Sequence, residues 1–190
     1  MTKIFVDMTP SLDGFVAAPG VSVEHPLGED GMVLHEWLAG DATDKAVADE
    51  FFAGTGAFVI GRRTFDLGEA PWGEDGTFRK PSFVVTHEPR PPLVKGPTTF
   101  TFVTGGVEQA VRQAREAAGG GNVSVMGGAS IVQQALAAGL VDELRIHVRP
   151  VLLGAGTRLF EHHGDDQVGL QTTRVRSTAL ATHMIYDVVR

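Results

Sequence analysis

The chain has 190 residues, a net charge of -7 and no cysteine. The missing cysteine excludes disulfide scaffolds, thiolate zinc sites and cysteine nucleophiles. The acidic balance argues against general nucleic-acid binding, which depends on neutralising phosphates. No stretch approaches the roughly 20 apolar residues of a membrane span, and the N-terminus is not of the signal-peptide type. We therefore expect one cytoplasmic domain over residues 1–190 that associates with neither nucleic acid nor membrane.

Residues 4–8 form the first predicted strand, and Asp7 interrupts its apolar run. A carboxylate in a buried strand is costly unless it is paired or serves the chemistry, whereas on an edge strand it would face water. Both alternatives stay open. Residues 11–17 then predict a turn that returns into a short extended piece, and residues 19–31 a surface loop, potentially a flap over a pocket.

Two helical segments follow, the first over residues 32–38 and the second beginning at a cap near residue 41 and reaching residue 52. The second carries its apolar residues on one face. Its acidic residues are expected on the solvated side, with a carboxylate that reaches into a pocket as the alternative: Asp44, Asp49 and Glu50.

A strand–glycine–helix junction is predicted where the apolar strand 57–60 runs into Gly61, Arg62 and Arg63. The first N–H groups of a helix and its dipole favour a phosphate, and guanidinium groups beside them suit that ligand. The alternative interpretation is that the two arginines form salt bridges at the surface.

A second junction of the same kind joins the strand 123–126 to a helix that begins at Ala129, through Gly127 and Gly128. Two glycines leave the backbone bare at the helix start. They fit either a phosphate cradle or a tight strand-to-helix turn.

The remaining elements complete an alternating pattern. Strands are predicted at 82–86, 100–103 and 144–148, a Pro-rich connector at 89–97, a helix from 107 to 118, and a final hairpin of 172–177 with 181–189. This order predicts an α/β fold in three layers: a mainly parallel sheet with helices on both faces and the antiparallel hairpin at one edge.

The polar side chains of strand 144–148 and the residue after it alternate with apolar ones and predict one wetted face: Arg145, His147 and Arg149. For His147 we expect a solvated or cross-strand role rather than catalysis. His162 and His163 lie near two aspartates, but adjacent histidines point apart on a strand and the segment has loop composition, so no metal site is expected.

Ligands of parallel sheets bind outside the carboxyl ends of the strands, so the two glycine junctions can hold the two halves of a dinucleotide. Side chains for a ribose 2′-phosphate would come from Arg62, Arg63, Thr86 and His87. This favours NADPH over NADH. The G-x-G-x-x-G fingerprint of ordinary Rossmann sites is absent from the sequence.

Several motifs together carry a resemblance to the dihydrofolate reductase superfamily. They are Ser11-Leu12-Asp13-Gly14, Ile60-Gly61-Arg62-Arg63-Thr64 and Met126-Gly127-Gly128-Ala129-Ser130. The runs 138–144 and 150–154 resemble more closely the reductase domain of the bifunctional riboflavin-biosynthesis enzyme, the RibD C-terminal domain family. The resemblance covers the whole chain. It implies a mainly parallel sheet of about eight strands, NADP(H) binding and a homodimer.

The resemblance also implies which residues hold the cofactor. Thr9 would contact the nicotinamide carboxamide, and the other implied residues are Gly61, Arg62, Arg63, Thr64, Thr86, His87, Gly127, Gly128, Ala129, Ser130 and Ile131. Dihydrofolate reductases carry a basic side chain where Ser130 stands here, and a pterin-binding carboxylate near the position of Lys45. Dihydrofolate reduction is therefore not expected, nor is the deaminase activity, whose zinc site needs cysteine.

The sequence thus predicts a stand-alone NADPH-dependent reductase of a small molecule, with hydride transfer as the chemistry of the cofactor. Asp7 is the candidate catalytic carboxylate, to orient the substrate or relay a proton, and Asp49 is the alternative. Two other functions remain open: a non-catalytic NADP(H)-binding regulatory module, and the reductase step of riboflavin synthesis on 5-amino-6-(5-phosphoribosylamino)uracil.

Overall fold

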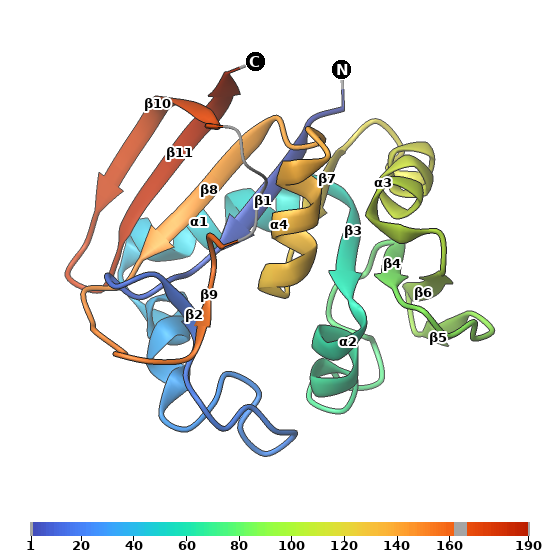
Figure 1. The fold of residues 1–190 in the computed structure, drawn as a ribbon, viewed down its shortest axis with the longest axis horizontal. Helices are drawn as coiled ribbons and strands as arrows, with labels where there is room; N and C mark the ends of the chain where they lie inside the picture. The colour runs from blue at the N-terminus through green and yellow to red at the C-terminus, as the bar shows by residue number, and fades with distance from the viewer. Residues whose placement is uncertain (1, 162–166, 190) are drawn as a thin grey trace.

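The computed structural model describes residues 2–161 and 167–189, and Figure 1 shows a twisted sheet at its centre. Its strands are β1 (Ile4–Met8), β3 (Thr55–Gly61), β4 (Ser82–Val85), β5 (Leu93–Lys95), β6 (Thr98–Val103), β7 (Asn122–Val125), β8 (Glu143–Val148), β10 (Gly169–Ser177) and β11 (Thr182–Val189). Within the described residues the nine strands follow the order β10-β11-β8-β1-β7-β3-β4-β6-β5. Two further strands, β2 (Phe15–Ala17) and β9 (Thr157–Arg158), pair with each other apart from this sheet.

The strands from β8 to β6 are parallel, and the outer strands β11, β10 and β5 are antiparallel. This confirms the mainly parallel sheet and the terminal hairpin. The sheet has nine strands rather than about eight, because part of the expected 89–97 connector pairs with β6 as β5. β1 lies inside the sheet between β8 and β7. The edge-strand interpretation of Asp7 is therefore wrong.

Helices cover both faces of the sheet, as expected. They are η1 (Gly31–Ala39, a 3-10 helix), α1 (Ala42–Gly54), α2 (Arg62–Gly68), α3 (Gly106–Ala117) and α4 (Ala129–Ala137). In Figure 1, α1 lies behind the sheet and α4 in front of it. Alternate side chains of β3 accordingly enter two cores: Val59 packs with α3 and α4, whereas Phe58 and Ile60 pack with Phe65 of α2. None of the helices in the described part of the chain is long and apolar enough to span a membrane.

The start of α1 is set by a capping box. The side chain of Asp41 accepts hydrogen bonds from the N–H groups of Thr43 and Asp44, and the Asp44 carboxylate accepts one from the N–H of Asp41. This arrangement turns Asp44 into the protein, where it is 1% exposed. The expectation that Asp44 lies on the solvated side is wrong, while Asp49 and Glu50 are exposed as expected.

Asp13 fastens the turn after β1 to a distant loop. Its carboxylate accepts hydrogen bonds from the Ser11 hydroxyl at 2.6 Å, the Leu153 N–H at 3.1 Å and the Gly154 N–H at 2.7 Å. The bond from Ser11, together with these N–H groups, lowers the pKa of Asp13 to about 2. Because the pKa of Asp13 is lowered in the folded protein, its hydrogen bonds stabilise the fold fully above about pH 4. This stabilisation is lost as the pH falls toward 2.

Candidate functional site

The two glycine junctions lie against each other at the carboxyl ends of β3 and β7. The Gly61 N–H donates to the Gly127 carbonyl at 2.8 Å. A Cβ at position 61 would lie 2.9 Å from Cγ1 of Ile131 and 3.5 Å from the Gly128 nitrogen. Only glycine therefore permits this close approach of the β3 end to α4 without displacement.

The second junction leaves a bare backbone at the start of α4. Gly127 has a φ of +87°, which favours glycine, and its peptide bond to Gly128 is cis. Gly128 is the N-cap of α4 and supplies no side-chain cap, so side chains do not occupy the first N–H groups there. The Thr64 hydroxyl lies beside them, 3.4 Å from where a Gly128 Cβ would stand. The structure thus brings Gly61, Thr64, Gly127 and Gly128 together.

The two arginines of the first junction differ in their surroundings. Nε of Arg62 contacts both carboxylate oxygens of Asp66, at 2.7 and 2.9 Å, and its guanidinium lies 3.8 Å from Glu88. The surface ion-pair interpretation therefore describes Arg62. Arg63 is exposed and has no hydrogen bond or ion pair within residues 2–161 and 167–189. Arg63 is thus the arginine of the two with a guanidinium available to an anion.

Thr86, His87 and Thr9 complete the expected cofactor residues outside the junctions. Thr86 is buried, and its hydroxyl accepts from the Glu88 N–H at 3.1 Å, while His87 is exposed. Thr9 is buried at the end of β1, where its hydroxyl accepts from the indole N–H of Trp37 at 3.1 Å.

A chain of buried titratable side chains begins two residues before Thr9. Asp7 Oδ1 lies 3.1 Å from Nε2 of His147, whose Nδ1 lies 2.9 Å from Nδ1 of His183. Nε2 of His183 in turn lies 2.9 Å from Oδ1 of Asp44. The four side chains come from β1, β8, β11 and α1, and we call them the Asp–His–His–Asp chain.

Trp37 of η1 connects this chain to Thr9. Its ring centroid lies 4.7 Å from that of His147 and 5.0 Å from that of His183. The same indole donates to Thr9. Thr9 follows the last residue of β1 and is two residues beyond Asp7, so the two stand about 6.6 Å apart along the extended backbone. The expected nicotinamide contact and the buried chain are thus neighbours.

Burial and hydrogen bonding shift the pKa values of His183 and Asp44 in opposite directions. Burial lowers the pKa of His183, and this outweighs the hydrogen bond to Asp44, which raises it. For Asp44, burial raises the pKa, but hydrogen bonds from His183, the Asp41 N–H and the Thr178 hydroxyl together lower it below its usual range. Asp44 is therefore the ionised end of the chain.

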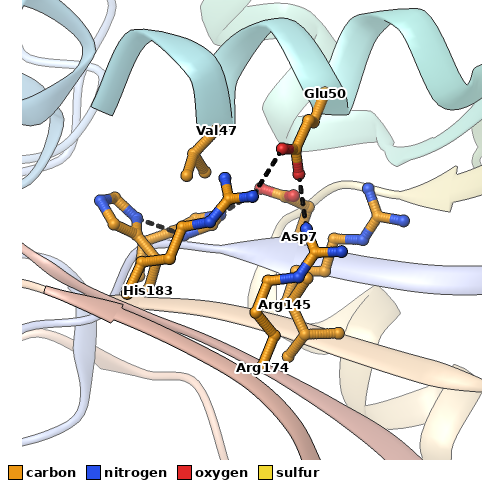
Figure 2. A pocket seen from close by; sticks show the side chains of 9 residues that line it. Asp7, Val47, Glu50, Arg145, Arg174 and His183 are labelled. Carbon is orange, nitrogen blue, oxygen red and sulfur yellow. Dashed lines mark hydrogen bonds and ion pairs between the residues drawn. The ribbon is translucent and has the colours of Figure 1, made fainter. Parts of the chain in front are cut away.

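The Asp7 end of the chain opens into a hollow between α1 and the strands β8, β11 and β10 (Figure 2). The inner part, about 20 Å³, has room for one water molecule and is lined by Asp7, His147 and His183 among others. The adjoining outer part measures about 330 Å³. Glu50 of α1 lines both parts and forms ion pairs with two arginines of β10, Arg174 at 2.8 Å and Arg176 at 2.9 Å.

Sequence reasoning placed part of this region incorrectly. His147 is 2% exposed and Arg149 is 3% exposed, so the predicted wetted face of β8 is covered. The cross-strand role expected for His147 is confirmed by its bond to His183. Arg149 instead contacts the carbonyls of Val33 and Leu180 and the carboxylate of Glu36.

Trp37 and His183 were not among the expected site residues. The signal that could have found His183 is the pairing of the last strand with β8, which sets His183 directly opposite His147. The expected loop histidines His162 and His163 lie outside the described residues. Within the described residues no group of three or more acidic or histidine side chains is arranged to hold a metal ion.

The sheet order, the helices on both faces and the paired glycine junctions define an α/β protein of the dihydrofolate reductase-like fold class. The chain belongs to the RibD C-terminal domain family, whose model matches residues 2–186. The uncharacterized protein YyaP of Bacillus subtilis (strain 168) is 27% identical over 165 residues, which cover 83% of this chain and 80% of YyaP.

Solved structures share this fold at low sequence identity. A Shewanella sp. PV-4 protein whose name places it in riboflavin biosynthesis superposes with a TM-score of 0.76 at 23% identity, over the full length of both chains. A pyrimidine reductase-like protein of Corynebacterium diphtheriae has a TM-score of 0.68 at 15% identity, covering all of this chain and 92% of that one. A deaminase/5-amino-6-(5-phosphoribosylamino)uracil reductase of Thermotoga maritima has a TM-score of 0.69 at 12% identity. The match covers 99% of this chain and 57% of that larger protein.

Proposed function

We propose that this chain is an NADPH-dependent reductase that transfers a hydride to a small molecule. The observation that carries the proposal is the contact between the Gly61 junction and the Gly127–Gly128 junction, a bare backbone surface at the start of α4 that a single Cβ would disturb. Membership of the RibD C-terminal domain family supports it, as does the shared fold with a Thermotoga maritima protein whose name includes 5-amino-6-(5-phosphoribosylamino)uracil reductase.

The residues present fit such a cofactor. The N–H groups at Ala129 and Ser130 and the hydroxyl of Thr64 would hold the pyrophosphate, because a helix N-terminus favours phosphate, whereas the Ile131 N–H already donates to the Gly128 carbonyl at 3.0 Å. Arg63 would bind the 2′-phosphate, since its guanidinium is exposed and unpaired within the described part of the chain. When bound, the cofactor supplies a hydride, that is, two electrons and one proton.

Thr9 and Asp7 are proposed for the reacting end of the site. Thr9 would contact the nicotinamide, and its hydroxyl is held in place by Trp37. Asp7 would orient the substrate or give it a proton, because its carboxylate lines the hollow while most of it is shielded from water, with 14% of its side chain exposed.

Titration with NADPH and NADH tests the cofactor, and we expect micromolar binding that favours NADPH. No binding of NADPH at that concentration would overturn the proposal. Loss of NADPH absorbance with an aldehyde, a quinone, a pterin or a flavin precursor would identify the substrate class. Binding without turnover of any of them would favour a regulatory NADP(H)-binding module instead. Rescue of a riboflavin auxotroph would favour the alternative that the chain reduces 5-amino-6-(5-phosphoribosylamino)uracil, the compound in the Thermotoga maritima protein's name.

A homodimer is also part of the proposal. The strand β10 leaves one edge of the sheet unpaired within the described residues, and apolar side chains on the hairpin are exposed there: Leu170, Val175 and Val189. Open strand edges with exposed apolar groups favour association with another chain. Sedimentation equilibrium should give twice the chain mass of 20.2 kDa, and a monomer would contradict this part of the proposal.

A further inference from the structure

The Asp–His–His–Asp chain needs three protons to form all of its hydrogen bonds. Three hydrogen bonds join its four side chains, and each bond needs one proton between its two heavy atoms. Two neutral imidazoles carry only two protons. The fully bonded chain therefore holds a third proton and has a net charge of -1. Without that proton, two acceptor atoms would face each other across one of the bonds, in the Nδ1 pair at 2.9 Å.

The third proton can exchange with solvent at the Asp7 end of the Asp–His–His–Asp chain, whereas the Asp44 end is closed to water. Asp44 is 1% exposed, and its carboxylate also accepts from the Thr178 hydroxyl and the Asp41 N–H. Asp7, at the other end, lines the hollow, whose inner part has room for a water molecule. A proton can thus enter or leave the chain at Asp7.

The charged groups around the Asp7 end lower the electrostatic cost of releasing the proton. Arg145 of β8 lines the hollow and pairs with Glu143 at 2.7 Å, and Arg174 and Arg176 of β10 pair with Glu50 of α1. Loss of the proton changes the chain from -1 to -2. Three arginines against two glutamates leave one positive charge near Asp7, which stabilises that more negative state.

We propose that the Asp–His–His–Asp chain supplies the proton that completes a reduction in this hollow. The proposal rests on the proposed hydride transfer from NADPH. As a hydride adds to the carbon of a C=O or C=N group, the π electrons move to the heteroatom, which takes a proton from Asp7. NADPH is oxidised, the double bond is reduced, and solvent returns one proton to the chain. Asp7 is the catalytic residue, and His147, His183 and Asp44 are positioning residues that replenish it.

Histidine ¹⁵N NMR of the free protein tests the chain without any substrate. Because burial lowers the pKa of His183, the spectra are recorded at pH 5, where we expect both Nε2 atoms to carry a proton and one proton to be shared between the two Nδ1 atoms. Two rings with unprotonated Nδ1 at pH 5 would overturn the proposal. In His183→Gln the amide can fill the space but cannot pass a proton, so the titration of His147 should move by at least about one pH unit. An unmoved titration refutes coupling along the chain.

Asp49→Asn, an exposed change on the same helix as Asp44, is the matched control and should leave the titration of His147 as it is in the wild type. If His183→Gln does not fold, as judged by circular dichroism, Asp44→Asn replaces it, since the amide keeps the size of the side chain. The same shift is expected there.

Kinetics with the panel compound that the wild type reduces provide the second readout. His183→Gln should lower kcat about 100-fold, change the pH profile of kcat, and leave KM and the Kd of NADPH within about twofold. An unchanged kcat and pH profile would overturn the relay while leaving the reductase intact. If the wild type reduces none of the compounds, the proposed function fails. The NMR titration then still tests whether protons are coupled along the Asp–His–His–Asp chain.

Discussion

Replacing Asp44 by alanine removes the acceptor on which the inner end of the buried chain depends. In the wild type this carboxylate accepts hydrogen bonds from Nε2 of His183 at 2.9 Å, the Thr178 hydroxyl at 3.0 Å and the Asp41 N–H at 3.1 Å. Asp41 is exposed and Thr178 partly so, and water can replace their lost partner. His183 is 3% exposed, so its N–H remains buried without an acceptor.

The magnitude follows from these contacts. A buried donor left unpaired costs about 1–3 kcal/mol, and loss of the Asp44 half of the capping box about 0.5–2 kcal/mol more. We therefore expect Asp44→Ala to lower the free energy of unfolding by about 1.5–5 kcal/mol. For a chain of this size that lowers Tm by roughly 3–20 °C.

Urea unfolding at pH 7 measures the effect, with Asp49→Ala on the exposed side of α1 as the control. The pKa of Asp44 is lowered in the folded protein, so the unfolded state binds more protons as the pH falls. The advantage of the wild type over Asp44→Ala should thus be fully present above about pH 5 and shrink as the pH falls through and below about 4.

Two results would refute the reasoning. A loss within about 0.5 kcal/mol of that of Asp49→Ala would mean that the carboxylate contributes little to the fold. A difference between Asp44→Ala and the wild type that stays constant from pH 7 to pH 3 would mean that folding does not lower the pKa of Asp44.

Three further outcomes are expected. Arg63→Ala should weaken NADPH binding by about 1.5–3 kcal/mol and leave NADH binding nearly unchanged in a fluorescence titration, and equal losses would contradict the 2′-phosphate assignment. Gly61→Ala should lower the free energy of unfolding by about 1–3 kcal/mol and weaken NADPH, because its Cβ would meet Ile131 at 2.9 Å. Gly54→Ala, with open space around its Cβ, is the control in the same urea assay, and a loss as large as that of Gly61→Ala would refute the steric argument. Asp13→Ala should speed amide hydrogen exchange in residues 150–156 at pH 7, and unchanged exchange would show that its hydrogen bonds do not hold that loop.

The sequence predicted the fold well because its apolar runs and glycine junctions are local signals. The two junctions at Gly61 and Gly127 lie where parallel strands end, and the order of elements gave the layers. The short strands β5 and β9 were not predicted. They have only three and two residues, too few to show an alternating pattern, and they are defined by pairing with a neighbouring strand.

The Asp–His–His–Asp chain could not be predicted, because its four residues are far apart in the sequence and polar residues in a strand usually indicate a face exposed to water. Alternation in β8 indicated one wetted face, and His147 was placed there. That face is instead covered by Trp37 of η1 and by α1, so the polar side chains satisfy one another rather than water. Periodicity shows which residues share a face of a strand, but not what covers that face.

The central place of β1 has a consequence for how the protein folds. Its two neighbours in the sheet come from late in the chain: Ile4 pairs with Val123, and Phe5 with Glu143. Contacts between residues so distant in sequence require long loops to close first, which slows folding. The strand that carries Asp7 can therefore pair only after residues 122–148 have reached the sheet. We expect refolding to be slow for a protein of this length, with the Asp–His–His–Asp chain among the last features to form.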